Sequence, residues 1–191
     1  MRAPKYTPSL TCSPLAWKLN VVPSGRTGLR RLAIFGGLLF IATARLSTQE
    51  PDSVAPDFTL ETLAGDTVTL SHLRGHPVFL NFWATWCKPC RGEMSDIIAA
   101  YDAKHVARLE VLAINLTDQE RMRDVRSFVR DLQLPFPVLL DQKGKVRKSY
   151  GLRGVPTSVF IDTRGVVRLV NIGPITRENI QRGLAEILPA H

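Results

Sequence analysis

Cysteine and histidine are scarce in this sequence. There are three cysteines and four histidines in 191 residues, and one cysteine, Cys12, lies near the start of the chain. The other two, Cys87 and Cys90, are too few for a framework of structural disulfides or for a four-ligand zinc site. The histidines show no spacing typical of metal ligands, so we expect neither a metal site nor a cofactor. The cysteine pair is therefore interpreted as a reactive one.

Acidic residues are absent from the first 45 positions. This stretch holds seven of the 25 Lys and Arg residues, whereas residues 46–191 hold the other 18 against 17 Asp and Glu residues. The formal net charge of +8 thus belongs mainly to the N-terminal stretch, and the remainder carries about +1. Because a nearly neutral domain lacks the basic surface that nucleic-acid binding requires, we expect no nucleic-acid partner.

Long hydrophobic runs are also missing. Residues 32–44 form a run of 13 residues without charge, whereas a membrane-spanning helix needs about 20. This run has the size of a signal-peptide core, basic residues precede it, and Ala42-Thr43-Ala44 fits a cleavage site. We therefore predict a basic cytoplasmic region at 1–31, a hydrophobic signal or anchor segment at 32–44, a linker at 45–54 and an exported domain at 55–191. Cleavage near Ala44 and retention as an anchor are both open at this point.

The stretch from Pro77 to Glu93 carries the reactive pair. Residues 78–83 are apolar apart from Asn81, as in a strand that is buried on both faces. Cys87 is then expected at the start of a helix and Cys90 one turn inside it, close enough for a disulfide. The positive end of the helix dipole favours a thiolate at Cys87, whereas Cys90 is flanked by core. We therefore expect Cys87 to attack and Cys90 to resolve the mixed disulfide.

The rest of the sequence alternates short apolar runs with segments of helical periodicity. This order predicts one compact α/β domain with a mixed central sheet flanked by helices and an added N-terminal β-hairpin. Strands are expected at 58–60, 68–70, 78–83, 109–116, 137–141, 157–161 and 166–170. Helices are expected at 87–103, at 118–132 with Asp118 as its cap, just before 150, and after a cap at Thr176.

Several motifs together resemble a known family. Residues 82–90, Phe-Trp-Ala-Thr-Trp-Cys-Lys-Pro-Cys, look like the active-site strand and loop of thioredoxins, and residues 154–157, Gly-Val-Pro-Thr, resemble their cis-proline loop. Residues 55–60 and 70–75, together with the exported leader, are similar to the TlpA/ResA branch of membrane-tethered extracytoplasmic thioredoxins, which includes the cytochrome c maturation type. The resemblance covers residues 55–188.

The resemblance implies a thioredoxin fold and a thiol–disulfide oxidoreductase that cycles Cys87 and Cys90 between dithiol and disulfide. The proline inside the Cys-x-x-Cys motif resembles the reducing members. Implied partners are proteins that contain disulfides, such as apocytochrome c or copper-site assembly proteins, and a membrane electron donor. Because this branch is mostly anchored by its N-terminus, the resemblance favours a domain held at the extracytoplasmic, or periplasmic, side of the cytoplasmic membrane over a protein secreted after cleavage near Ala44.

The resemblance also assigns roles to neighbours of the pair. Trp86 would form an exposed apolar rim that receives the partner, the alternative being ordinary core packing. Pro156, if cis, would place the backbone of Val155 opposite the disulfide, where a substrate strand could pair with it. A trans proline at the start of a strand is the alternative.

Glu93 is implied to be catalytic together with Cys87 and Cys90. ResA-type proteins have a glutamate three residues after the second cysteine that tunes the thiols and moves protons. Thioredoxins have a buried aspartate six residues before the first cysteine, and here that position is Asn81, which cannot titrate. Proton transfer to Cys90 would therefore use another group, for which Glu93 is the nearest candidate. A solvated helix carboxylate is the alternative.

Two other functions remain open from the sequence. A copper chaperone could hold Cu(I) with the two thiolates, although no His or Met stands at a spacing that demands a third ligand. A peroxiredoxin-like thiol peroxidase would share the Pro56-Asp57-Phe58 opening, but that family surrounds a lone cysteine with Thr and Arg. Copper titration and peroxide consumption would separate these alternatives from disulfide reduction.

Overall fold

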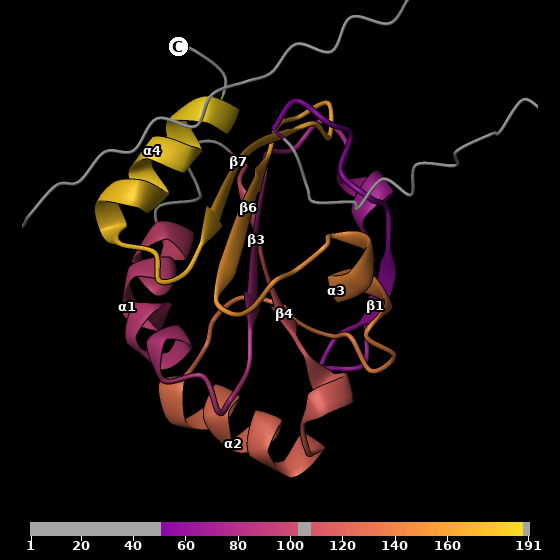
Figure 1. Cartoon of the computed structure of the whole chain (residues 1–191), viewed down its shortest axis with the longest axis vertical. Coiled ribbons are helices and arrows are strands. Elements are labelled where there is room, and N and C mark those ends of the chain that lie inside the picture. The colour runs from indigo at the N-terminus through magenta and orange to yellow at the C-terminus, as the bar shows by residue number, and fades with distance from the viewer. Residues whose placement is uncertain (1–50, 103–107, 189–191) are drawn as a thin grey trace, which may run out of the picture. The chain divides into compact units, whose positions relative to one another are not determined.

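The computed structural model describes residues 51–102 and 108–188, and a five-stranded mixed sheet forms its centre (Figure 1). The strand order is β5-β4-β3-β6-β7. Strand β3 pairs in parallel with β4, and β4 with β5, whereas β6 is antiparallel to both β3 and β7. The bounds are β3 Val78–Trp83, β4 Glu110–Asn115, β5 Val138–Leu140, β6 Thr157–Ile161 and β7 Val167–Ile172.

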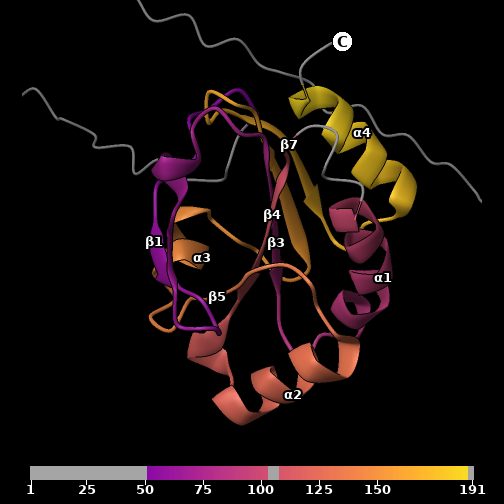
Figure 2. The same ribbon diagram turned by 180° about the vertical axis from the view of Figure 1, so that it is seen from behind.

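Helices and a hairpin cover the two faces of this sheet. Helices α1 and α4 lie on one face, and the antiparallel pair β1–β2 with α3 lies on the other, in both views (Figures 1 and 2). The helices are α1 Lys88–Asp102, α2 Met122–Leu132, α3 Lys145–Ser149 and α4 Arg177–Ile187; the hairpin strands are β1 Thr59–Glu61 and β2 Thr67–Thr69. The predicted α/β fold with an added hairpin is confirmed, and Thr176 caps α4 as expected by accepting a hydrogen bond from the Asn179 N–H.

The central strand β3 is buried along its whole length. Because successive side chains of a strand point to opposite faces, its residues fall into two sets. Phe79 and Trp83 pack against residues of α1, α2 and α4. Val78, Leu80 and Phe82 pack on the opposite face, beneath the hairpin and α3. Asn81 shares the face of Phe79 and Trp83, so it is the polar side chain of β3 that faces the helices.

The predicted cap of α2 is wrong. Helix α2 begins at Met122 with Arg121 at its N-cap, and Asp118 lies in a separate 3-10 turn at Thr117–Gln119. The reason is a contact between distant segments: the Arg147 side chain donates to Asp118 Oδ2 at 3.0 Å. A 3-10 turn at Leu70–Leu73 follows β2, and the carboxylate of Asp57 binds its backbone by accepting from the Ser71 N–H.

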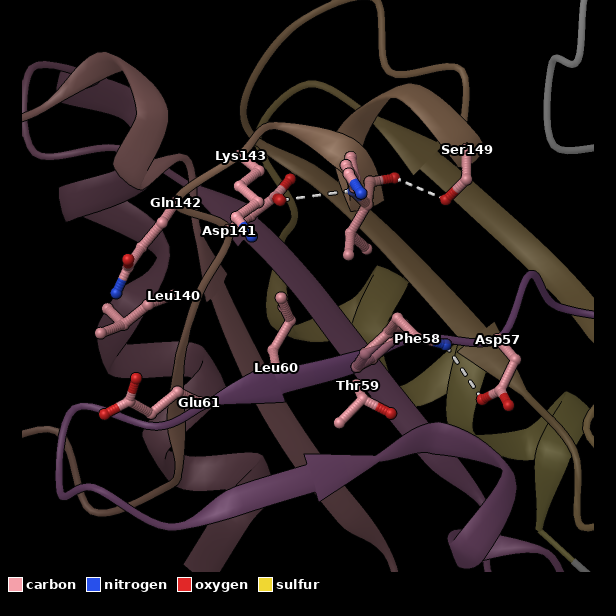
Figure 3. Close-up of a pocket in the computed structure, with 12 residues that line it drawn as sticks. Asp57, Phe58, Thr59, Leu60, Glu61, Leu140, Asp141, Gln142, Lys143 and Ser149 are labelled. Atoms are coloured by element: carbon pink, nitrogen blue, oxygen red, sulfur yellow. Dashed lines mark hydrogen bonds between the residues drawn. The ribbon is translucent and has the colours of Figure 1, made fainter.

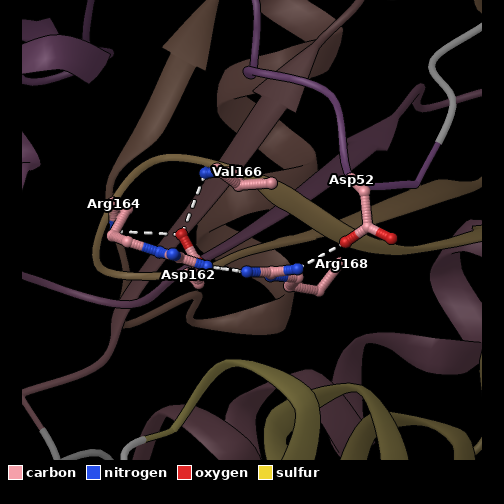
Figure 4. A network of polar contacts seen from close by, with 5 residues as sticks. All are labelled: Asp52, Asp162, Arg164, Val166 and Arg168. Atoms are coloured by element: carbon pink, nitrogen blue, oxygen red, sulfur yellow. Dashed lines mark hydrogen bonds and ion pairs between the residues drawn. The ribbon is translucent and has the colours of Figure 1, made fainter.

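Polar contacts attach the first described residues to the β6–β7 hairpin (Figure 4). The Asp52 N–H donates to the Val167 carbonyl and the Val167 N–H donates to the Ser53 carbonyl, at 2.7 and 2.8 Å. Arg168 pairs with the carboxylates of both Asp52 and Asp162. The last residues of the segment predicted as linker therefore bind the folded domain.

The predicted leader, residues 1–44, lies outside the described residues. Within 51–102 and 108–188 no helix is long and apolar enough to cross a membrane.

Candidate active site

Cys87 occupies the N-cap position of helix α1. Strand β3 ends at Trp83, the Cys87 N–H donates to the Ala84 carbonyl at 3.2 Å, and the helix begins at the next residue, Lys88. Cys90 lies one turn into the helix and forms a disulfide with Cys87. Its backbone N–H also donates to Cys87 Sγ at 3.2 Å. A helix N-terminus that donates hydrogen bonds to a sulfur stabilises the thiolate form of that residue.

The two sulfur-bearing residues differ in access. Cys87 is 4% exposed and Cys90 is 0% exposed. Both residues belong to the buried cluster that includes Met94 and Trp83, and the small exposed area of the pair lies on Cys87. This difference fits the predicted roles, in which Cys87 exchanges with the partner and Cys90 resolves the mixed disulfide.

The cis-proline loop lies at the same end of the sheet. Thr157 at the start of β6 pairs with Phe82 near the end of β3, so the preceding Pro156 lies next to the strand end that leads to Cys87. The Val155–Pro156 peptide bond is cis, as the resemblance implies. Trp86 is 57% exposed, so the alternative that it packs in the core is wrong. The fold thus brings Trp86, the cysteine pair and Val155–Pro156 to one end of the molecule.

Glu93 is buried, so the alternative of a solvated helix carboxylate is wrong: the residue is 4% exposed. Its Oε1 accepts from Asn81 Nδ2 at 2.8 Å, and its Oε2 accepts from the Ile175 N–H at 2.9 Å. Burial raises the pKa of Glu93 above its ordinary value, and the two hydrogen bonds oppose this rise only in part. A buried carboxyl with a raised pKa one turn after Cys90 is suited to exchange a proton with that thiol.

Glu120 was not predicted, although it holds the loop before the cysteines. Its Oε1 accepts from the Thr85 N–H at 2.8 Å and from Asn115 Nδ2 at 3.1 Å. Thr85 and Glu120 also line a hollow of about 480 Å³ beside Trp86. One signal was present in the sequence: residues that follow neighbouring parallel strands gather at the same edge of a sheet, and Glu120 follows β4 as Thr85 follows β3.

Two other hollows lie away from the cysteines. One, of about 510 Å³, lies between β1 and α3 and is lined by residues such as Leu60, Asp141 and Lys143 (Figure 3). The other, of about 650 Å³, is lined by the hairpin turn and by α2. No predicted site residue lines either hollow, so the predicted chemistry belongs to the end of α1. Among the residues that the structure describes, no group of three or more His, Cys, Asp and Glu side chains could hold a metal ion.

The fold and this site define a class of protein: a thiol–disulfide oxidoreductase of thioredoxin-like fold. Residues 51–170 match the AhpC/TSA family, and the chain belongs to this family.

Named relatives agree with this class. The chain is 38% identical over 131 residues to the thioredoxin-like protein YneN of Bacillus subtilis, covering 68% of this chain and 76% of that protein. It is 38% identical over 137 residues to the thiol-disulfide oxidoreductase ResA of Geobacillus thermodenitrificans, covering 72% and 78%. The crystal structure of StoA from Bacillus subtilis superposes with a TM-score of 0.61 at 30% identity, covering 69% of this chain and 98% of that one.

Proposed function

We propose that this oxidoreductase reduces disulfides of partner proteins on the outer side of the cytoplasmic membrane, where its N-terminal segment anchors it. The observation that carries the proposal is the position of Cys87, at the N-cap of α1. Next to it the exposed ring of Trp86 offers an apolar contact surface for a protein. The anchor and the location rest on the basic region at 1–31 and the apolar run at 32–44.

The reaction transfers two electrons to the partner. The Cys87 thiolate attacks one sulfur of the partner's disulfide, so a mixed disulfide forms and the partner's other sulfur leaves as a thiolate. Cys90 then loses its proton, for which Glu93 is the proposed acceptor, and attacks Cys87 Sγ. The partner leaves as a dithiol and the Cys87–Cys90 disulfide forms. A membrane thiol donor, the remaining proposed partner, returns the pair to the dithiol state.

The proposed substrates are disulfides of apocytochrome c segments or of copper-site assembly proteins. Support comes from the similarity to ResA and StoA and from the sequence motifs of the TlpA/ResA branch. The Val155 backbone would pair with an extended substrate segment beside the disulfide.

Trapping tests the proposal. In the full chain, Cys90→Ser removes the resolving thiol, so a partner should remain attached to Cys87 through a mixed disulfide that reductant releases. The matched control is the double variant Cys87→Ser with Cys90→Ser, which should trap nothing. Identification of the trapped protein by mass spectrometry names the substrate; absence of any Cys87-dependent adduct contradicts the proposed function.

Location and the two alternative functions are tested separately. The chain should sediment with membranes. Protease that reaches the outer side of an intact cytoplasmic membrane should digest the domain. The reduced protein should neither consume peroxide at catalytic rates nor bind Cu(I) with sub-micromolar affinity. Either activity at those levels would instead favour the peroxidase or the copper chaperone.

A further inference from the structure

The side-chain amide of Asn81 lies between two polar groups in the core. Its Nδ2 donates to Glu93 Oε1 at 2.8 Å and to Ser158 Oγ at 3.2 Å. Its Oδ1 is buried and has no hydrogen-bond partner among the residues that the structure describes. Asn81 and Ser158 are both 0% exposed. Both donor hydrogens of this amide form hydrogen bonds, and its buried oxygen accepts none. Such an amide suits a charged carboxylate, because a charged carboxylate can only accept hydrogen bonds.

The two oxygens of Glu93 are not equivalent for a proton. Oε2 accepts from the Ile175 N–H at 2.9 Å. A backbone N–H can only donate, so it could not receive a hydrogen bond from a protonated Oε2. Oε1 instead faces the Asn81 amide, and an amide exchanges its donor and acceptor ends when it rotates by half a turn about its terminal torsion. Oε1 is thus the oxygen whose neighbour can become an acceptor.

Ser158 can follow such a rotation. In the present orientation the Ser158 hydroxyl oxygen accepts from Asn81 Nδ2. A hydroxyl also carries one donor hydrogen that rotates freely. After rotation of the amide, Asn81 Oδ1 would therefore accept from both the Ser158 hydroxyl and a protonated Glu93. The oxygen that is unused in one orientation gains two donors in the other, whereas Nδ2 moves to the buried position of Oδ1, where no described residue accepts from it. The charged carboxylate is therefore the better partner of this amide, and the neutral acid the poorer one.

We propose that Asn81 is a positioning residue for the proton of Glu93: its amide donates to the charged carboxylate and turns over to accept from the neutral acid, which carries its proton on Oε1. Ser158 reverses its hydrogen bond in the same step. The value of this arrangement for the enzyme rests on the proposed function, in which Glu93 takes a proton from Cys90. No second charge enters the core, because the partner that adapts is neutral in both states.

Few titratable groups face Glu93. Burial and the hydrogen bonds from Ile175 and Asn81 account for its shifted pKa, and no charged side chain among the described residues contributes to it. The ion pair between Asp96 of α1 and Arg177 of α4 is partly exposed and is not among the causes. On α1 the neighbouring titratable residue is Cys90, which does not titrate while it is disulfide-bonded. The oxidised protein therefore isolates the proton equilibrium of Glu93.

Nuclear magnetic resonance on the oxidised full chain tests the proposal directly. The ¹³C shift of the Glu93 carboxyl reports its protonation, and the ¹⁵N and ¹H shifts of the Asn81 side-chain amide report its hydrogen bonds. We expect both sets of signals to titrate with the same midpoint. Asn81 amide signals that stay constant through the titration of Glu93 would overturn the proposal.

Two variants give an independent measurement. Asn81→Leu removes both hydrogen-bonding ends at similar volume, and the charged form of Glu93 loses the stronger hydrogen bond. The titration midpoint of Glu93 should therefore rise by about one pH unit in this variant. The matched control Asn171→Leu makes the same substitution on β7, where the amide donates to the Gly173 carbonyl and not to Glu93, and it should leave the midpoint unchanged. An unchanged midpoint in Asn81→Leu, or an equal shift in both variants, contradicts the proposal.

These measurements need no partner protein. A failure to trap a substrate through Cys87 would count against the proposed function and would leave the linked titration of Asn81 and Glu93 in place. Conversely, a constant Asn81 signal in an enzyme that does trap a partner would count only against the role of Asn81.

Discussion

Cys87 and Cys90 lie three positions apart at the start of helix α1, but their surroundings differ. Cys87 lies at the N-cap, where its sulfur accepts the Cys90 N–H, whereas Cys90 is fully enclosed. The difference follows from the strand–loop–helix arrangement, which leaves a small part of Cys87 exposed at the N-cap and encloses Cys90 in the core. Glu93, one turn further on, is drawn inward by Asn81 and by the Ile175 N–H. In the proposed reaction, exchange with the partner, resolution and proton transfer are thereby divided among Cys87 at the N-cap and two side chains of α1.

At this scale, Glu93→Gln should slow thiol–disulfide exchange. Loss of a general base costs on the order of 10²-fold in rate. Glu93 accepts a proton only in its charged form, and burial raises its pKa. The wild-type rate of mixed-disulfide resolution should therefore rise as pH increases through this raised pKa, and Glu93→Gln should lack that rise. Stopped-flow measurements from pH 5 to 9 check this.

The matched control for that variant is Glu178→Gln on α4, whose carboxylate is exposed. It should leave the rate and its pH profile unchanged. Equal pH profiles for wild type and Glu93→Gln would rule out the proton-transfer role of Glu93.

The sequence was sufficient to select Asn81, Glu93 and the cysteine pair, but not to connect the first two. Spacing along a helix indicates that Glu93 is near Cys90. The contact with Ile175 joins residues 82 positions apart, and the one with Glu120 arises where two strand ends meet. Such contacts depend on tertiary packing, which local patterns do not contain.

At the scale of elements, the position of α4 depends on close packing against the sheet. A Cβ added at Gly183 would meet ring carbons of Phe160 at 2.5 to 2.6 Å. Phe160 is itself stacked on Phe79, with ring centroids 4.6 Å apart, so it has little room to move away. The absence of a side chain at residue 183 thus allows α4 to approach β6.

Gly183→Ala should therefore destabilise the protein although alanine favours helices. Overpacking costs about 1–3 kcal/mol, against a gain of about 1 kcal/mol from helix propensity. We expect a net loss of up to about 2 kcal/mol in the free energy of unfolding by urea.

Gly92 on α1 provides the control with the same substitution. It is exposed and a Cβ there has nothing within 4 Å. Gly92→Ala should stabilise the protein by about 0.5–1 kcal/mol. Equal effects at the two positions would show that helix propensity, and not packing on Phe160, decides the outcome.

Most elements could be predicted because their sequence patterns are unambiguous. The run at 78–83, apolar apart from Asn81, predicted the bounds of β3, and those of β6 were predicted as well. The start of α2 could not be predicted, since Asp118 has the side chain of a good helix cap and is instead bound by Arg147, which is 29 residues away. The long-range ion pair with Arg147, and not the local preference of aspartate for a helix N-cap, decides the contacts of Asp118.

At the scale of the whole described domain, a polar network joins its first residues to the far hairpin of the sheet (Figure 4). Asp162 accepts from the Val166 and Arg164 N–H groups at 2.9 Å each and pairs with Arg168, which also binds Asp52. Burial acts to raise the pKa of Asp162, but these hydrogen bonds together hold it below its ordinary value. The carboxylate therefore stabilises the fold when it is charged.

Asp162→Asn should destabilise the protein at pH 7, by about 1–3 kcal/mol for hydrogen bonds to a charged group. A carboxyl with a lowered pKa contributes stability above the pKa of the unfolded chain and loses it as pH falls through the folded pKa. The difference between wild type and variant should thus shrink in acid, as measured by urea unfolding from pH 7 to 3. The control Asp102→Asn, at the exposed end of α1, should change stability by less than about 0.5 kcal/mol. A difference that stays constant with pH would contradict the role of the charge.

The central claim is that Cys87 is the attacking thiol and Cys90 the protected one, and alkylation tests it most directly. The fully reduced chain is treated briefly with iodoacetamide between pH 5 and 9, and mass spectrometry locates the modified residue. We predict that Cys87 reacts first, already below pH 8.5, the region where an ordinary thiol ionises. Cys90 should stay unmodified in the same samples. Modification of Cys90 first, or of both cysteines at equal rates, would contradict the account.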